Sequence, residues 1–220
     1  MSDQSKICHG ISGNLSLIET LRFEPKNGFI RKSAHLDRMA RSAELLEFDI
    51  DREALADALD FEPEETSRVR LELFQDGHFE TTVVPFVKQA DDTQWTIAIA
   101  QTQIESTNML FGHKTSQRDV YQAARAEFDP EHINEVILCN EKGLVCEGTI
   151  TNIFIRTGDG KLLTPHLDCG LLPGIFRQHL LETNQAEEAF LTIDDLQQAD
   201  EIYVGNSLRE FIRAKLANAT

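Results

Sequence analysis

The sequence predicts an α+β fold of two subdomains, and three observations lead to this prediction. Strand-like runs mix with helical stretches through the first hundred residues. Residues 102–113 then lack clear periodicity, and short apolar runs alternate with further helical stretches beyond them. We therefore expect an N-terminal α+β subdomain over residues 1–104 and a C-terminal α+β subdomain over residues 105–220. A cleft between two subdomains is the default place for a binding site.

The first subdomain is predicted to open with a hairpin followed by two helices. LSLIETLRF at 15–23 alternates enough for a strand, and PKNG at 25–28 supplies a turn into FIRK. The apolar residues from His35 to Phe48 fall on one helical face. The stretch from Asp51 to Leu59 reads as a short second helix with an aspartate cap.

Three strand-like runs then complete the expected antiparallel sheet of this subdomain. The first two are separated by Asp76 and Gly77, a pair typical of a tight turn. The three runs are Val69–Gln75, Glu80–Lys88 and Gln94–Gln101.

The second subdomain is predicted to combine short strands with helices. The expected strands are 135–139, 144–146, 152–156, 161–163 and 201–204. The expected helices are 120–128, 174–183, 194–199 and a closing helix at 208–217.

Composition excludes some classes of partner. The chain has 220 residues, 41% of them hydrophobic and 26% charged, which is ordinary for a globular protein. Its formal net charge of −16 argues against nucleic acid or an anionic membrane as the main partner, because both need a basic face. The start, MSDQSKICHGISG, lacks the apolar core of a signal peptide, and no apolar run approaches the roughly 20 residues of a membrane span.

The cysteines and histidines indicate neither disulfides nor a metal site. Cys8, Cys139, Cys146 and Cys169 form no Cys-x-x-Cys pair, and the seven histidines are scattered. Cys139 and Cys146 lie in apolar surroundings and read as core thiols, so we expect a reducing, cytoplasmic location and no metal.

The most informative segment is 147–177, EGTITNIFIRTGDGKLLTPHLDCGLLPGIFR. It places a carboxylate, Glu147, before a strand, and a glycine, Gly174, at a helix start. A carboxylate suits a ring nitrogen, and the free N–H groups at a helix N-terminus suit a phosphate. On the residues alone, Glu147 could equally be a turn glutamate, and Pro-Gly could simply mark where a helix begins. Likewise, Ser207 could cap the expected last helix, donate to a phosphate, or do both.

Four motifs together resemble those of class IV pyridoxal-phosphate enzymes, the group of branched-chain aminotransferases and aminodeoxychorismate lyases. They are HKT at 113–115, EGTITNIF at 147–154, LLPGIFR at 171–177 and GNSLRE at 205–210. The resemblance covers the chain from about residue 15 to residue 216 by motif order. It implies a fold type IV, D-amino-acid aminotransferase-like architecture with a C-terminal pseudo-barrel and pyridoxal 5'-phosphate in the interdomain cleft. It also implies a homodimer.

The resemblance assigns roles to residues that the pattern alone leaves ambiguous. Lys114 would carry the cofactor as a Schiff base and later move a proton at the substrate carbon. Glu147 would contact the ring nitrogen, and Arg38, in AHLDRM, would neutralise the phosphate. The remaining cofactor-binding residues would be Gly174, Ile175, Asn206 and Ser207.

Substrate contacts are predicted from the strand ETLR at 19–22, which resembles a family strand near the active site. Thr20 is a candidate proton donor, and Arg22, Arg31 and Arg118 are candidates for binding carboxylates, because a guanidinium binds a carboxylate with two hydrogen bonds. Arg177 and Arg209 are further cations near the motifs.

Three functions remain open at this stage. The first is a 4-amino-4-deoxychorismate lyase that releases 4-aminobenzoate and pyruvate for folate synthesis, supplied by an aminodeoxychorismate synthase. The second is an aminotransferase for branched-chain or D-amino acids with 2-oxoglutarate. Gln117 and Arg118 resemble the Asn-Arg of some lyases, and position 119 is Asp where such aminotransferases carry a tyrosine, so the first is favoured. The third is a cofactor-free binding protein.

Overall fold

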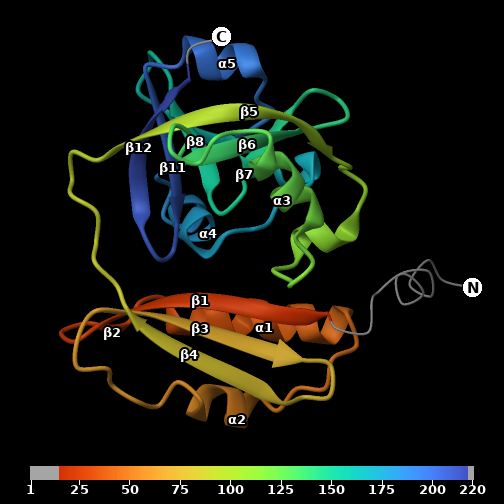
Figure 1. Ribbon diagram of the computed structural model, residues 1–220, viewed down its shortest axis with the longest axis vertical. Helices are drawn as coiled ribbons and strands as arrows, with labels where there is room; N and C mark the ends of the chain where they lie inside the picture. Colours follow the sequence, from red (N-terminus) through yellow and green to blue (C-terminus); the bar gives the residue numbers. More distant parts are fainter. Residues whose placement is uncertain (1–14, 218–220) are drawn as a thin grey trace, which may run out of the picture. The chain divides into compact units, whose positions relative to one another are not determined.

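The computed structural model describes residues 15–217, which divide into two compact units (Figure 1). Unit 1 runs to Val87 and also contains His113–Gln117. Unit 2 contains Lys88–Gly112 and the chain from Arg118 onward. This division differs from the expected boundary between residues 104 and 105, because a strand expected in the first subdomain belongs to unit 2 and a short segment of the second returns to unit 1.

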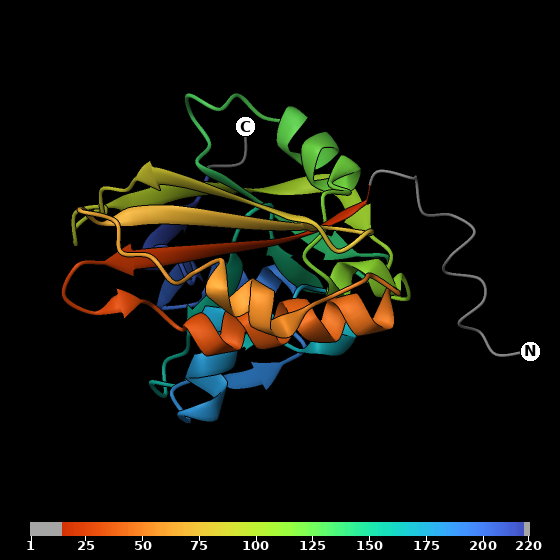
Figure 2. The ribbon, with the colours of Figure 1, turned by 90° about the horizontal axis from the view of Figure 1, so that it is seen from below.

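Unit 1 is an antiparallel sheet with two helices (Figure 2). The strand order is β2-β1-β3-β4, where the strands are β1 (Ser16–Glu24), β2 (Gly28–Phe29), β3 (Ser67–Phe74) and β4 (Phe79–Pro85). The helices are α1 (Lys32–Leu45) and α2 (Arg52–Asp57). Asp51 caps α2 by accepting from the backbone N–H groups of Glu53 and Ala54, as the sequence predicts.

The segment 113–117 is bound to the first strand of unit 1 through its backbone. Ile18 N donates to Lys114 O at 2.8 Å, and Ser116 N donates to Ser16 O at 2.9 Å. Leu17 and Thr115 form an antiparallel bridge between these two bonds. The HKT motif therefore pairs alongside β1, although a long stretch of chain separates the two in sequence.

Unit 2 is an eight-stranded mixed sheet in the order β10-β9-β8-β11-β12-β5-β6-β7. Its strands are β5 (Gln94–Ile104), β6 (Glu135–Asn140), β7 (Val145–Gly148), β8 (Asn152–Arg156), β9 (Leu162–Pro165), β10 (Glu187–Ala189), β11 (Glu201–Asn206) and β12 (Glu210–Leu216). The helices are α3 (Asp119–Ala126), α4 (Ile175–Glu182) and α5 (Ile193–Gln198), with 3-10 turns η2 (Met109–Gly112) and η3 (Leu167–Cys169). Three pairs are parallel: β9 with β10, β5 with β12, and β5 with β6.

Two elements correct the predictions from sequence. The run 94–101 does form a strand, β5, but it pairs with β12 and β6 in unit 2 and not with the antiparallel sheet of unit 1. The closing helix predicted at 208–217 is wrong, because β12 occupies this stretch and pairs with β11 and β5. Its side chains follow the period of a strand, with Ile212 and Ala214 buried and Arg213 and Lys215 exposed.

The core of unit 2 explains why its strands read as apolar runs. Every residue of β6 is buried, and so are Asn152–Ile155 in β8. A strand that is covered on both faces of its sheet is buried along its whole length, so its sequence is a nearly continuous apolar run. Among residues 15–217, no helix has the length and hydrophobicity to span a membrane.

Candidate active site

Lys114 lies in the segment 113–117, here called the Lys114 strap, which pairs with β1 in unit 1. Its side chain is half-buried, and its carbonyl is fixed by the bond from Ile18 N. The preceding residue, His113, is bound to the Ser42 hydroxyl of α1 through Nδ1 at 2.9 Å. Burial lowers the pKa of His113, so this ring is neutral near pH 7. The residues on both sides of Lys114 are thus held in place within unit 1.

A buried ionic network lies under the same strand. Glu19 of β1 accepts from Nε and an Nη of Arg38 at 2.7 Å each, and its Oε2 lies 2.6 Å from His35 Nδ1. Burial alone would raise the pKa of Glu19, but the charge of Arg38 and the hydrogen bonds outweigh it and lower this pKa to about 2. Burial lowers the pKa of His35. Glu19 therefore occupies two N–H groups of the predicted phosphate-binding arginine.

The predicted substrate residues of β1 point away from this network. Successive residues of a strand face opposite sides, so Thr20 and Arg22 lie on the face opposite Glu19. Thr20 is paired in register with Arg70 of β3, and Arg22 with Arg68. Arg22 Nε also lies 2.9 Å from a Glu24 carboxylate oxygen.

Arg31, the third substrate candidate of unit 1, occupies an unusual backbone position. It precedes α1 with φ 56° and ψ 34°, in the left-handed region that non-glycine residues rarely adopt. The structure gives it a half-buried place at the start of the helix, and its predicted role stays a prediction.

Glu147 lies at the end of β7 in unit 2, with 4% of its surface exposed. Its Oε1 accepts from Tyr121 Oη at 2.7 Å and from Leu172 N at 3.2 Å. Burial and the nearby Glu147 charge raise the pKa of Tyr121, which keeps the phenol protonated and able to donate. The carboxylate is therefore fixed by donors from α3 and from the segment before α4.

Arg118, predicted to bind substrate, has structural contacts in unit 2. One Nη donates to the carbonyl of Thr149, and the guanidinium carbon lies 4.6 Å from the centre of the Tyr121 ring. Arg177 is buried and donates to the Pro165 carbonyl and to Glu188, so it holds α4 to β9 and β10. These two arginines brace the loops around Glu147 and α4.

Helix α4 begins where the sequence predicted an anion site. Its N-cap is Gly174, which has no side chain to accept from the first N–H groups, and these groups are typical anion donors. A Cβ at position 174 would lie 1.9 Å from Asn152 Oδ1, so a larger residue here would force the Asn152 side chain or the start of α4 to shift. Asn152 in turn donates to the Leu172 carbonyl at 3.0 Å. Asn152 thus braces the start of α4.

The second predicted phosphate segment is a tight turn between β11 and β12. Asn206 Oδ1 accepts from Leu208 N at 3.1 Å and from Arg209 N at 3.0 Å, while its Nδ2 donates to Ile150 O at 3.0 Å. Ser207 is buried in this turn. The option that Ser207 caps a final helix is wrong, because a strand follows. The loop 149–151 and the turn 206–209 are joined by the Asn206 side chain.

Glu135 organises the loop 149–151, and sequence reasoning missed it. Its carboxylate is fully buried and accepts from the backbone N–H of Val136, Thr149 and Ile150 and from the hydroxyls of Thr149 and Thr151, at 2.5–3.1 Å. A Cβ on Gly148 would lie 2.8 Å from this carboxylate, so Gly148 lets it approach. A charged residue inside an otherwise apolar strand was the available signal.

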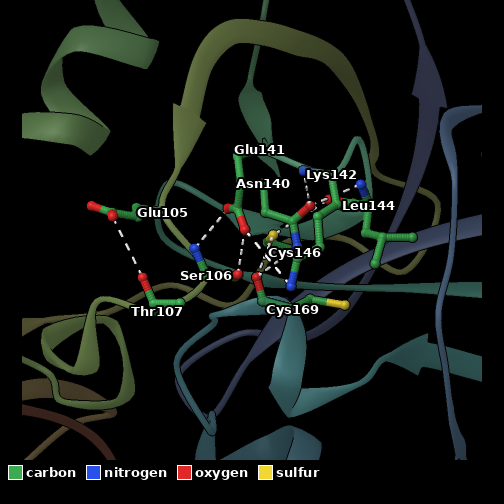
Figure 3. A network of polar contacts seen from close by, with 9 residues as sticks. All are labelled: Glu105, Ser106, Thr107, Asn140, Glu141, Lys142, Leu144, Cys146 and Cys169. Atoms are coloured by element: carbon green, nitrogen blue, oxygen red, sulfur yellow. Dashed lines mark hydrogen bonds and ion pairs between the residues drawn. The ribbon is translucent and has the colours of Figure 1, made fainter.

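A second polar network holds the backbone at Cys169, which precedes α4 in the chain (Figure 3). Glu141 accepts from Ser106 N at 2.8 Å and from the Ser106 hydroxyl at 2.5 Å. Asn140 Nδ2 donates to Cys169 O at 3.1 Å, and Cys146 Sγ lies 3.2 Å from the same oxygen. Cys139 and Cys146 are buried free thiols, in agreement with the expectation of core thiols, and Cys169 is a third buried free thiol.

The donor set fits pyridoxal phosphate in its chemistry. A buried serine and an uncapped helix start can bind a phosphate, and a fixed carboxylate can bind a protonated ring nitrogen. A lysine amine can bind an aldehyde. Lys114, Thr20, Arg22, Arg31 and Arg38 belong to unit 1, whereas Glu147, Arg118, Gly174, Ile175, Asn206 and Ser207 belong to unit 2.

The architecture is that of fold type IV enzymes. A crystal structure of a candidate amino-acid aminotransferase from Mesorhizobium loti superposes with a TM-score of 0.87 at 45% identity, covering 92% of this chain and all of that chain. A candidate branched-chain amino acid aminotransferase from Thermotoga maritima gives a TM-score of 0.81 at 25% identity, covering 93% and 77% of the two chains.

The chain belongs to the amino-transferase class IV family, whose profile matches residues 16–217. A candidate aminodeoxychorismate lyase of Schizosaccharomyces pombe is 31% identical over 193 residues, which cover 83% of this chain and 82% of the relative. The chain is therefore an enzyme of a family whose members, lyases and aminotransferases, depend on pyridoxal phosphate.

Proposed function

We propose that this chain is a pyridoxal-phosphate-dependent 4-amino-4-deoxychorismate lyase that releases 4-aminobenzoate and pyruvate. The observation that carries the cofactor assignment is the buried Glu147 carboxylate, held at Oε1 by Tyr121 and Leu172. The similarity to the S. pombe relative over most of both lengths favours the lyase. Asp119 stands where related aminotransferases carry a tyrosine, which favours it further.

Each predicted cofactor residue has a separate task in this proposal. Lys114 is the covalent carrier, and Glu147 keeps the ring nitrogen protonated. The backbone N–H groups of Gly174 and Ile175 and the Ser207 hydroxyl bind the phosphate, with Asn206 shaping the turn around Ser207. Arg38 is the proposed arginine of the phosphate, although two of its five N–H groups donate to Glu19, whose charge offsets that of the guanidinium.

The residues of the chain then move protons at the substrate. When bound, the cofactor supplies an electron sink that stabilises negative charge at the amine-bearing carbon of the substrate. Lys114 removes the proton from that carbon, and the bond from the neighbouring ring carbon to the ether oxygen of the enolpyruvyl group breaks. Lys114 or the Thr20 hydroxyl protonates the departing group, which leaves as pyruvate while the ring becomes aromatic. Arg22, Arg31 and Arg118 are the candidate partners of the two substrate carboxylates.

The setting of the enzyme is part of the proposal. We infer a homodimer, with an aminodeoxychorismate synthase as the source of substrate. Three buried free thiols are typical of a reducing compartment, so we place the enzyme in the cytoplasm.

A second candidate is an amino-acid aminotransferase, acting on branched-chain or D-amino acids with 2-oxoglutarate. It is favoured by the 45% identity to the M. loti structure over that entire chain. In that reaction Lys114 moves a proton between the substrate carbon and the cofactor.

One assay separates the two. Purified protein loaded with pyridoxal phosphate is given aminodeoxychorismate without any 2-oxo acid, and 4-aminobenzoate and pyruvate are followed over many turnovers. Sustained equimolar release is the expected result. Absence of release, together with consumption of valine, leucine or glutamate only when a 2-oxo acid is present, would establish the aminotransferase instead.

A further inference from the structure

Tyr121 of α3 makes a direct hydrogen bond to the proposed partner of the ring nitrogen. Its Oη lies 2.7 Å from Glu147 Oε1, within the range of a charge-assisted bond. Leu172 N donates to the same oxygen at 3.2 Å. Two donors from separate parts of the chain therefore converge on one oxygen, which sets the rotation of the carboxylate about its last bond.

The Tyr121 ring is itself held in place. The Arg118 guanidinium carbon lies 4.6 Å from the ring centre, and the Phe111 ring contacts it edge-on at 6.0 Å. Arg118 is anchored by its bond to the Thr149 carbonyl, in the loop that directly follows β7. The phenol thus links the loop after β7 to the Glu147 side chain, and it cannot rotate away without losing the contacts of its ring.

The chemistry of the two groups decides which of them donates in the Tyr121–Glu147 hydrogen bond. A phenol can donate or accept, whereas an ionised carboxylate only accepts. A neutral Tyr121 therefore donates to an ionised Glu147, and this bond favours the charged carboxylate that a protonated ring nitrogen needs.

We propose that Tyr121 is a positioning residue that fixes the Glu147 carboxylate for its contact with the cofactor ring. This inference rests on the proposed function for its consequence, but the Tyr121–Glu147 bond itself exists without cofactor. Phenylalanine at position 121 would keep the ring contacts and remove only the hydroxyl.

The first test needs no cofactor, because the chain contains two tyrosines, Tyr121 and Tyr203. In the Tyr203→Phe protein, the two tyrosine ring bands of the Raman spectrum, whose relative intensity reports how strongly a phenol donates a hydrogen bond, therefore report Tyr121 alone. Adding Glu147→Gln removes the charged acceptor, and we expect the intensity ratio to change from that of a strong donor to that of a weaker one. An unchanged ratio would overturn the proposal, whatever the protein catalyses.

The second test uses the loaded enzyme and compares Tyr121→Phe with Tyr203→Phe. Tyr203 is a matched control, because it also donates to a glutamate, Glu201, at 2.6 Å, in β11. We expect Tyr121→Phe to lower kcat about tenfold, the loss typical of one hydrogen bond to a charged group, with KM within about twofold. It should also shift the pH at which the visible absorbance of the bound cofactor changes, and Tyr203→Phe should do neither.

The two tests fail separately. If the wild-type protein binds no pyridoxal phosphate, the proposed function fails while the Raman measurement still tests the Tyr121–Glu147 bond. If the cofactor binds but Tyr121→Phe leaves both kcat and the absorbance profile unchanged, Tyr121 has no positioning role.

Discussion

Arg38 donates to both carboxylate oxygens of Glu19, from Nε to Oε1 and from an Nη to Oε2, at 2.7 Å each. Both side chains are buried, with 5% and 1% of their surface exposed. The pair joins α1 to β1, the strand against which the Lys114 strap is bound. Arg38, which the sequence predicts to neutralise a phosphate, therefore also stabilises unit 1 through its pair with Glu19.

Replacing one partner of this pair should destabilise the fold strongly. Glu19→Gln would leave the Arg38 charge buried without its counter-charge, and such changes cost about 3–5 kcal/mol. Glu72→Gln is the control, because Glu72 pairs with Arg70 on β3 in a more exposed position, where a pair contributes about 0–1 kcal/mol. Chemical denaturation of both variants gives the comparison. Equal losses of unfolding free energy would contradict the assignment of the buried pair.

The same network predicts the acid sensitivity of the protein. The pKa of Glu19 falls from 4.5 to about 2 on folding, so its stabilisation is complete above pH 4.5 and is lost as the pH falls toward 2. The pKa of His35 is also lowered from 6.5 by burial, so the unfolded chain binds this proton first and stability begins to decline below pH 6.5. Unfolding free energies measured from pH 8 to pH 3 should decrease in this order. His35→Gln should remove the decline near pH 6 and retain the one below pH 4.5.

Gly174→Ala should impair cofactor binding. A Cβ would lie 1.9 Å from Asn152 Oδ1 and would push aside the side chain that donates to Leu172 O before α4. We expect the dissociation constant for pyridoxal phosphate to rise at least about tenfold, the equivalent of one lost hydrogen bond to a charged group. Gly158→Ala is the matched control, because its Cβ would have a nearest neighbour at 3.8 Å. Equal affinities of the two variants, measured by fluorescence titration, would count against a phosphate at this helix.

Glu135→Gln should disturb the loop 149–151 and with it the Asn206 turn. The amide would present donors to hydroxyl and N–H groups that now donate to the carboxylate, which leaves buried groups unpaired at a cost of about 1–3 kcal/mol each. We expect a loss of several kcal/mol in unfolding free energy. Glu131→Gln, on an exposed carboxylate nearby in sequence, should change it by less than about 0.5 kcal/mol. An unchanged unfolding free energy in Glu135→Gln would contradict the proposal that the Glu135 carboxylate holds the loop 149–151.

Local patterns predicted most elements of the fold, and pairing between distant strands decided the rest. The helix predicted over 35–48 and the Asp51 cap depend on neighbouring residues; the structure has the helix as α1, three residues earlier at each end, and contains the cap. Residues 208–217 contain good helix formers, but pairing with β11 and β5 makes β12 a strand, since tertiary contacts override propensity. β5 was assigned to the wrong sheet for the same reason, because nothing local indicates a parallel partner far along the chain. β10, EEA, has no apolar alternation from which to predict it.

Residues of the candidate site that belong to a sequence motif could be predicted, whereas residues that support the site through contacts with distant parts of the chain could not. Glu147 and Gly174 stand out as a carboxylate and a glycine in a recognisable order. Tyr121 and Glu135 were missed, because their importance lies in hydrogen bonds to residues 26 and 14 positions away. Position 119, where a tyrosine would be typical of an aminotransferase, is Asp, while the phenol that reaches Glu147 comes from further along α3.

The most direct measurement is to identify the lysine that carries the cofactor. Protein loaded with pyridoxal phosphate is reduced with borohydride, digested, and mapped by mass spectrometry, with Lys114→Ala as the comparison. We predict that the modification falls on Lys114, and that Lys114→Ala loses both the modification and the visible absorbance. Modification of another lysine in the wild-type protein, or an unchanged spectrum in Lys114→Ala, would contradict the account.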